Sequence, residues 1–323
     1  AKAWGAERDG YGGHVWRNCY FGPRPGTSQW QGGEGVMFNA TRHGTTLDNV
    51  TIRHTTDDTA NFHGYWSPVA SVAGNRVTFD KNAETRRAFP RDLEIGDGVI
   101  FFDRTSGAEL GRAKVTAMDG DTVTLDKPPA ATAGALAEWP DHECAGWRIE
   151  NCDWHDNYQR LLIQSGPGTV RHCRFTRWGS AVELNSVFPY VEGGVPRGIR
   201  IEDNVFTDVG IAVYAHTFAS GQAPTLRNIT IAGNTFNWPA ERALALEHVA
   251  DPEITGNRFT GEPQSGTTPP RTHALAAEPS LVPDTPSTAP DYFCTWNVQG
   301  FVSSYASADV QADAMTEANL FGK

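Results

Sequence analysis

The chain has 323 residues, of which 39% are hydrophobic and 20% are charged, a composition typical of a globular protein with a large core. Its 38 acidic and 27 basic residues give a formal net charge of −11, so the average surface repels a phosphate backbone and we expect no nucleic-acid partner. No apolar run approaches the roughly 18 to 20 residues that cross a bilayer, so we also expect no membrane insertion.

The sequence opens with no basic and apolar leader that would mark a signal peptide. Its five cysteines include no CxxC pair and no Cys/His cluster with zinc spacing, so we expect no metal site and no cofactor. The thiols leave the compartment open, and a secreted or periplasmic location is favoured. The oligomeric state, with a homo-oligomer among the options, is left open.

One short phrase recurs along the chain: an apolar residue, a polar pair and then an aromatic or aliphatic anchor. The anchors are Phe21, Ile52, Trp154, Phe175, Phe206, Phe236 and Phe259. They lie 21 to 31 residues apart, with one interruption of 102 residues. Regular spacing, short β-rich phrases and no amphipathic helix predict an all-β fold, a right-handed parallel β-helix. Leucine-rich repeats and propellers fit worse, because the phrases are not leucine-dominated and the period is too short.

Strand alternation places one residue of each phrase at an equivalent inward position. These residues are Cys19, Val50, Cys152, Cys173, Asn204, Asn234 and Asn257. We expect a ladder in which the asparagines bond along the stack and the cysteines are free.

Residues 1–66 and 146–261 are therefore predicted to form the β-helix. The interruption, residues 67–145, reads as alternating strands joined by Gly-Asn and Asp-Gly turns, which predicts a small antiparallel barrel-like subdomain. Residues 262–323 are rich in Pro, Ser and Thr in their first half and are interpreted as an extended linker and C-terminal tail.

The stretch "HTTDDTANFHG" carries Asp57 and Asp58 just after the anchor Ile52, where no other phrase has paired acids. Glu34 lies 23 residues before Asp57, approximately one coil away, and neighbouring coils stand roughly 4.8 Å apart. Three carboxylates are expected to share one face. Their mutual repulsion would raise one pKa and supply the acid and base of glycosidic cleavage. A solvated turn is the simpler alternative, and a calcium loop is not matched.

Further polar residues follow successive anchors at a shared offset and are expected on the same face. They are Glu183, Asn185, Tyr214 and His216, and Glu192 is an additional candidate for binding sugar hydroxyls.

The ordered motifs "PRPGTSQWQGGEG", "DDTANFHG", "GDGVIFFDRTSGAEL", "LLIQSGPGTVRHCRF" and "YVEGGVPRGIRIEDNVF" resemble glycoside hydrolase family 110. The similarity covers roughly residues 4–260. It implies an exo-acting α-1,3-galactosidase that inverts the anomeric centre and needs no metal.

The resemblance also implies roles for individual residues. Its D-D-x-x-N-x-H-G motif falls on Asp57 and Asp58, as base and water-positioning group, with Asn61 and His63. The family's upstream aspartate falls on Glu34 in "EGVMF", which the resemblance implies to be the general acid.

Two further substrate-binding positions come from the same resemblance. Glu192 matches a sugar-lining glutamate, and Arg24 matches the arginine of the P-R-P-G-T segment. The chain departs from the family pattern at Glu34, which replaces an aspartate, and at Met37, Tyr190 and Val191. These departures put the identity of the sugar in question.

The resulting hypothesis is an inverting exo-glycoside hydrolase that acts on a terminal α-linked sugar, α-galactose, within an oligosaccharide or glycan. One alternative is a polysaccharide lyase or epimerase, which would need a cation such as Arg53 or Arg160 beside the acids. The other is a non-catalytic carbohydrate-binding β-helix.

Overall fold

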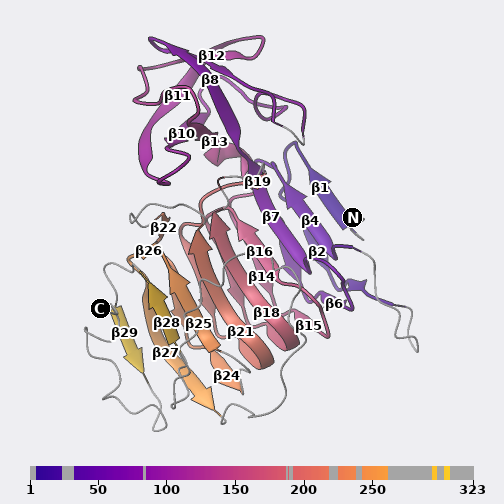
Figure 1. Cartoon of the computed structure of the whole chain (residues 1–323). Helices are drawn as coiled ribbons and strands as arrows, with labels where there is room; N and C mark the ends of the chain where they lie inside the picture. Colours follow the sequence, from indigo (N-terminus) through magenta and orange to yellow (C-terminus); the bar gives the residue numbers. More distant parts are fainter. Residues whose placement is uncertain are drawn as a thin grey trace.

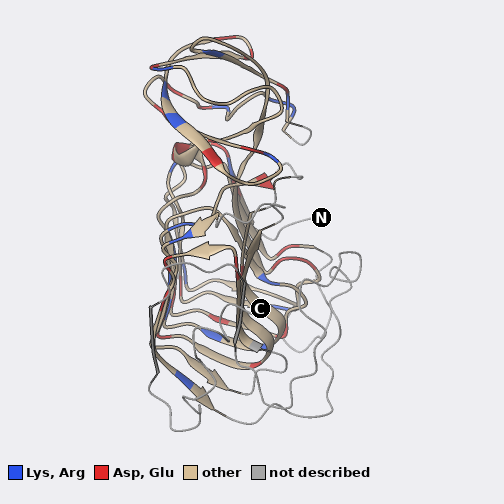
Figure 2. Ribbon diagram, turned by 60° about the vertical axis from the view of Figure 1, so that its left-hand side comes forward, with Lys and Arg blue, Asp and Glu red and all other residues tan. Residues whose placement is uncertain are grey.

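A computed structural model describes residues 5–23, 33–82, 85–186, 188, 192–217, 225–237, 242–260, 293–296 and 302–305. A stack of β-coils makes up most of it, and a small barrel projects beside strand β7 (Figure 1). Figure 2 shows the same arrangement from another side, with acidic and basic residues intermixed over coils and barrel. Within the described ranges, no helix is both long and apolar enough to span a membrane.

Successive coils add strands to three faces, and each strand pairs in parallel with the same face of the next coil. The first face contains β2 (Val15–Arg17), β5 (Thr46–Asp48), β14 (Trp147–Glu150), β17 (Gly168–Arg171), β20 (Ile199–Glu202), β23 (Thr230–Ala232), the start of β27 (Glu253–Thr260) and β29 (Val302–Tyr305). The second face contains β3 (Tyr20–Phe21), β6 (Thr51–Arg53), β15 (Asp153–His155), the starts of β18 (Arg174–Ser186) and β21 (Val205–Thr217), β24 (Thr235–Asn237) and the end of β27. The third face contains β1 (Gly5–Arg8), β4 (Val36–Asn39), β7 (Ala60–Tyr65), β16 (Leu161–Gln164), the ends of β18 and β21, β25 (Arg242–Glu247) and β28 (Phe293–Trp296). This pairing confirms the predicted parallel β-helix.

The interior of the coils is built from the predicted anchors. Phe175, Phe206, Phe236 and Phe259 stack one above the other, with ring centroids 4.9, 5.1 and 5.0 Å apart. Each is at most 1% exposed, so the stack removes a continuous apolar column from water.

The corner between the first and second faces explains the recurring phrase. Each coil has one residue with positive φ at this corner. In chain order these residues are Asn18, Asn49, Asn151, His172, Asp203, Gly233 and Gly256. Asn, Asp and Gly tolerate this left-handed conformation best. The residue that follows points inward and forms the expected ladder.

Within this ladder, Asn234 Oδ1 accepts from the backbone N–H of Asn204 at 2.9 Å, and Asn257 Oδ1 accepts from that of Asn234 at 2.9 Å. Cys173 lies one coil further along, where its backbone N–H donates to Asn204 Oδ1 at 2.9 Å. Cys19, Cys144, Cys152 and Cys173 are free, as predicted for the ladder cysteines.

The predicted barrel is present between β7 and β14. Strands β8 (Ser67–Ala73), β9 (Arg76–Phe79), β10 (Gly98–Phe102), β11 (Glu109–Asp119), β12 (Thr122–Leu125) and β13 (Leu136–Glu138) close into an antiparallel barrel. Two-residue turns at Gly74–Asn75 and Gly120–Asp121 join its hairpins, and both glycines have positive φ. A 3-10 turn, Pro140–His142, leads back to the coils.

Three short strands and the expected tail complete the described chain. β19 (Glu192–Gly193) pairs antiparallel with β7, and β22 (Leu226–Arg227) pairs with β26 (Val249–Ala250). Within residues 262–323, which were expected to be a linker and tail, β28 pairs with β25 and β29 pairs with β27. Both strands therefore extend faces of the β-helix.

Candidate active site

The outer side of the third face is polar over several coils. Its inward residues, such as Phe62, Ile163 and Leu184, belong to the core, so the alternate residues point outward. One outward row runs through Met37, Asn61, Leu162, Glu183 and Tyr214. A parallel row, called here the amide row, contains Asn39, His63, Gln164 and Asn185. Both rows therefore present their side chains on the same side of the sheet.

Glu34 and the aspartate pair lie where the chain enters this face. The backbone N–H of Gly35 donates to the carbonyl of Asp58 at 2.9 Å, which places Glu34 beside the aspartates on the next coil. Ile52 pairs with Trp154 and Ala60 pairs with Leu161, so eight residues separate the first pair from the second on one coil and seven on the next. The turn before β7 is thus one residue longer than the turn before β16.

Glu34 has the electrostatics of a proton donor. Burial, together with the negative charges of Asp57 and Glu192, raises the pKa of its carboxyl from 4.5 to about 7. A hydrogen bond with the Asn61 side chain and the charge of Arg8 oppose this rise. A carboxyl with such a pKa keeps a proton near neutral pH while its neighbours can be ionised.

The two aspartates have different environments. Asp57 is half-buried, and its Oδ1 accepts from the backbone N–H of Asp58 at 3.0 Å. Asp58 is only 6% exposed, and burial raises the pKa of its carboxyl well above 3.8. Arg160 opposes that shift, since its Nε lies 3.3 Å from Asp58 Oδ1.

Glu183 joins the same cluster from the next coil. Its Oε2 lies 3.3 Å from Arg160 Nε, and its Oε1 is 2.9 Å from both His216 Nε2 and Asn185 Nδ2. Burial alone would raise its pKa, but Arg160, His216 and Asn185 together lower the pKa to about 2. Glu183 is therefore an anion that ties Arg160 to the third face.

Glu192 approaches the acids from β19. Its Oε1 lies 3.8 Å from His63 Nε2, while His63 Nδ1 is 2.7 Å from the carbonyl of Gly64. A carbonyl can only accept, so Nδ1 donates and Nε2 faces the site. The charge of Glu192 acts on both Glu34 and Asp58.

Of the other positions named from the family resemblance, some lie within the described residues and some do not. Met37, which departs from the family pattern, accepts hydrogen bonds at its sulfur from Arg8 at 2.8 Å and Asn39 at 3.1 Å. Arg24, Tyr190 and Val191 lie outside the described residues.

Buried polar atoms without hydrogen-bond partners gather around this face. They include Glu34 Oε2, Asn39 Oδ1, Asn61 Oδ1, His63 Nε2, Gln164 Oε1 and Asn185 Oδ1. Each such group costs about 1–3 kcal/mol when nothing binds it. Their concentration on one face indicates a place where water or a ligand supplies the partners.

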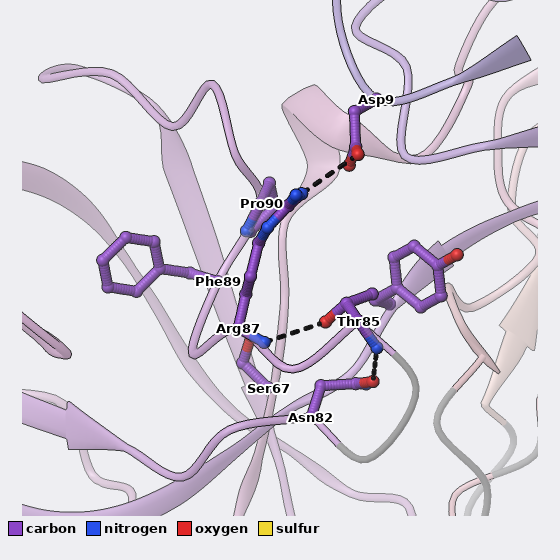
Figure 3. Close-up of a pocket in the computed structure, with 8 residues that line it drawn as sticks. Asp9, Ser67, Asn82, Thr85, Arg87, Phe89 and Pro90 are labelled. Carbon is purple, nitrogen blue, oxygen red and sulfur yellow. Dashed lines mark hydrogen bonds and ion pairs between the residues drawn. The ribbon is translucent and has the colours of Figure 1, made fainter.

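A pocket at the base of the barrel has a different character from the acid cluster (Figure 3). It is lined by Asp9, Tyr65, Ser67, Asn82, Thr85, Arg87, Phe89 and Pro90. Arg87 pairs with Asp9 at 3.0 Å, and Asn82 Oδ1 accepts from the backbone N–H of Thr85 at 3.0 Å, as Figure 3 shows. These partners hold the loop to the coils and leave the acid cluster as the better candidate site.

Within the described part of the chain, no group of three or more His, Cys, Asp or Glu side chains is arranged to hold a metal ion.

Sequence reasoning gave Arg160 and Gln164 too little weight. Arg160 was considered only as a cation for lyase chemistry, and Gln164 was not considered. Gln164 could have been found from alternation, because in "LLIQ" the first and third residues point inward, which turns the polar fourth residue outward.

One curated protein resembles part of this chain. Alpha-1,3-galactosidase A of Akkermansia muciniphila is 32% identical over 105 residues, which are 31% of this chain and 17% of that protein. The chain thus matches only about a sixth of the length of this relative. No family model matches the sequence.

Solved structures similar to this chain include tailspikes of bacteriophages. The Gp54 tailspike of the Acinetobacter baumannii phage AP22, solved with a capsular saccharide, is 10% identical with a TM-score of 0.21, covering 78% of this chain and 48% of that one. The gp49 tailspike of Pseudomonas phage LKA1 is 12% identical with a TM-score of 0.22, covering 78% and 49%. Such scores are too low to support any functional argument, and the fold rests on the strand pairing described above.

Proposed function

We propose that the protein is an inverting exo-glycoside hydrolase that releases a terminal α-linked sugar, α-galactose. The observation that carries the proposal is a glutamic acid with a pKa of about 7, Glu34, next to Asp57 and Asp58 on the following coil. Glycosidic cleavage requires this combination of a protonated and an ionised carboxyl group.

In this mechanism Glu34 donates its proton to the leaving oxygen. Asp57 or Asp58 removes a proton from a water that attacks the opposite face of the sugar ring. Inversion requires the two carboxyl groups to stand about 6.5–9.5 Å apart, which leaves room for that water. Glu183 and Arg160 then act on the charge of Asp58, while Asn61, His63 and Glu192 line the sugar.

The choice of α-galactose rests on the partial similarity to Alpha-1,3-galactosidase A and on the family resemblance of the motifs. The outward carboxylates and amides of the third face also suit a neutral sugar, because hydroxyl groups can donate to them.

The electrostatics of the site argue against a lyase or epimerase of uronates. Such an enzyme needs a free cation to neutralise the substrate carboxylate. Of the two cations considered for that chemistry, Arg160 is shared between Asp58 and Glu183, and further acids surround it.

The test is hydrolysis of nitrophenyl α- and β-glycosides and of short galactosyl oligosaccharides, with NMR observation of the anomer first released. Release of β-galactose from an α-galactoside supports the proposal. A product of retained configuration, or turnover of none of these substrates by the intact protein, contradicts it. Binding of glycans that persists unchanged in Asp58→Asn without any turnover would instead favour a carbohydrate-binding protein.

A further inference from the structure

The amide row continues the candidate site beyond the acids. Asn39, His63 and Gln164 are register partners on β4, β7 and β16, and Asn185 on β18 directly follows Leu184, the partner of Ile163. Neighbouring parallel strands stand about 4.8 Å apart, so the row offers one polar group per coil along the axis of the β-helix.

The row is buried yet lacks internal partners. Asn39, His63, Gln164 and Asn185 are at most 3% exposed, and Asn39 Oδ1, Gln164 Oε1 and Asn185 Oδ1 have no hydrogen-bond partner. The orientation of Asn185 is fixed, since its Nδ2 donates to the carboxylate of Glu183, which can only accept. Its oxygen is therefore the free group.

The free atoms determine the chemistry of a ligand. The oxygen of Asn185 can only accept a hydrogen bond, and the oxygens of Asn39 and Gln164 add two further acceptors, so the row favours groups that donate. Sugar hydroxyls donate, whereas an ionised carboxylate, sulfate or phosphate does not. The nearby anions Glu183 and Glu192 disfavour a negatively charged ligand further.

We infer that the amide row is an acceptor subsite for a neutral oligosaccharide, in which the sugars that follow the terminal one lie over Gln164 and Asn185. The inference rests on the proposed function for the position of the terminal sugar at Glu34. It adds that the preferred ligand is uncharged and at least three residues long, and that Gln164 and Asn185 recognise its inner sugars.

The test measures binding separately from turnover. Calorimetry with the Glu34→Gln protein uses neutral galactosyl oligosaccharides of two to five residues and oligogalacturonides of matched length. We expect affinity for the neutral series to rise with length, and the oligogalacturonides to bind more weakly. Equal affinity for two and five residues, or equal affinity for the two series, would overturn the inference.

Substitutions then locate the subsite. Gln164→Met and Asn185→Leu in the same background should each weaken binding of the four-residue ligand about three- to tenfold and leave the two-residue ligand within twofold. Asn237→Ala, which removes a partnered asparagine from the outer side of the second face, is the matched control and should change neither. An equal loss for both ligand lengths, or no loss for either, contradicts the assignment.

The outcomes separate the two proposals. Length-dependent binding without any turnover by the unsubstituted protein would refute the hydrolase and keep the subsite. Turnover whose kcat/KM is the same for two and five sugars, together with flat binding, would keep the hydrolase and refute the subsite.

Discussion

Two rows with buried asparagines run along the same β-helix, and they differ in whether the side chains find hydrogen-bond partners within the protein. Inside the coils, Asn204, Asn234 and Asn257 donate and accept along the stack, and none has a buried atom without a partner. On the outer side of the third face, Asn39 and Asn185 sit at the same strand spacing and leave their oxygens free.

The difference separates polar residues that the fold needs from polar residues that a ligand needs. An internal ladder is satisfied by its own neighbours, so it stabilises the stack. The outer row is stable only because the surrounding structure supports it, which is the usual sign of a functional site. The same residue type therefore has different consequences when it is replaced.

The largest expected effect is on chemistry. Glu34→Gln should lower kcat on a neutral galactoside about 10²–10⁴-fold, because an amide cannot protonate the leaving oxygen. Initial-rate kinetics measure this, with circular dichroism as the control for folding. A variant with more than a tenth of the original kcat would remove Glu34 from the mechanism.

The largest effect on stability is expected inside the coils. Asn234→Ala should lower the free energy of unfolding by about 2–4 kcal/mol, since it leaves the backbone N–H of Asn204 and the carbonyl of Ile201 without partners. Urea unfolding provides the measurement. A loss below about 0.5 kcal/mol, the range of ordinary surface changes, would show that the ladder is not a stabilising element.

The pKa of Glu34 predicts a dependence on pH. A native pKa of about 7 against 4.5 means that the folded state binds more protons, so the free energy of unfolding falls as pH rises between these values. Glu34→Gln should remove this part of the slope. Activity should decline on the alkaline side as pH passes about 7, when Glu34 loses its proton. Identical stability profiles for the two proteins would show that Glu34 ionises normally.

Arg160 should set the ionisation of Asp58. Arg160→Gln removes a cation 3.3 Å from Asp58 Oδ1, so the acidic limb of kcat/KM should move to higher pH. Arg160→Lys should restore part of the shift, and Arg177→Lys, on a surface pair with Asp156, should leave the limb in place. A fall in activity without displacement of the limb would assign Arg160 a packing role alone.

The smallest effect is expected on the outer row. Gln164→Met should raise the free energy of unfolding by about 1 kcal/mol, because it replaces a buried oxygen without a partner by an apolar group of similar shape. Thermal unfolding without ligand measures the gain. A loss of stability of similar size would mean that the row is satisfied by the fold, as the internal ladder is.

Much of this architecture could be predicted from the repeated phrase. The left-handed corner requires Asn, Asp or Gly, and the anchor must be large and apolar, so both recur visibly. The Gly-Asn turn likewise predicted a hairpin of the barrel. Strands β28 and β29 could not be placed from the sequence, because the Pro-rich segment before them breaks the spacing of the phrases.

The candidate site was harder to predict. Paired acids stand out in a sequence, so Asp57 and Asp58 were found together with Glu34 one coil away. Arg160 and Gln164 look like ordinary surface residues in one dimension. Which residues they lie beside depends on the register between coils. The turn before β7 is one residue longer than the turn before β16, and the amino-acid composition does not reveal this difference.

The placement of the barrel has a consequence for how the chain assembles. Ala60 on β7 pairs with Leu161 on β16, so these neighbours are separated by about a hundred positions along the polypeptide. Bringing such distant segments together from a fully open chain is slow. The barrel consists of local hairpins, and closing β8 against β13 already draws the two ends of the detour to one point. Once the barrel is closed, the first half of the solenoid therefore stands next to the point where the second half begins.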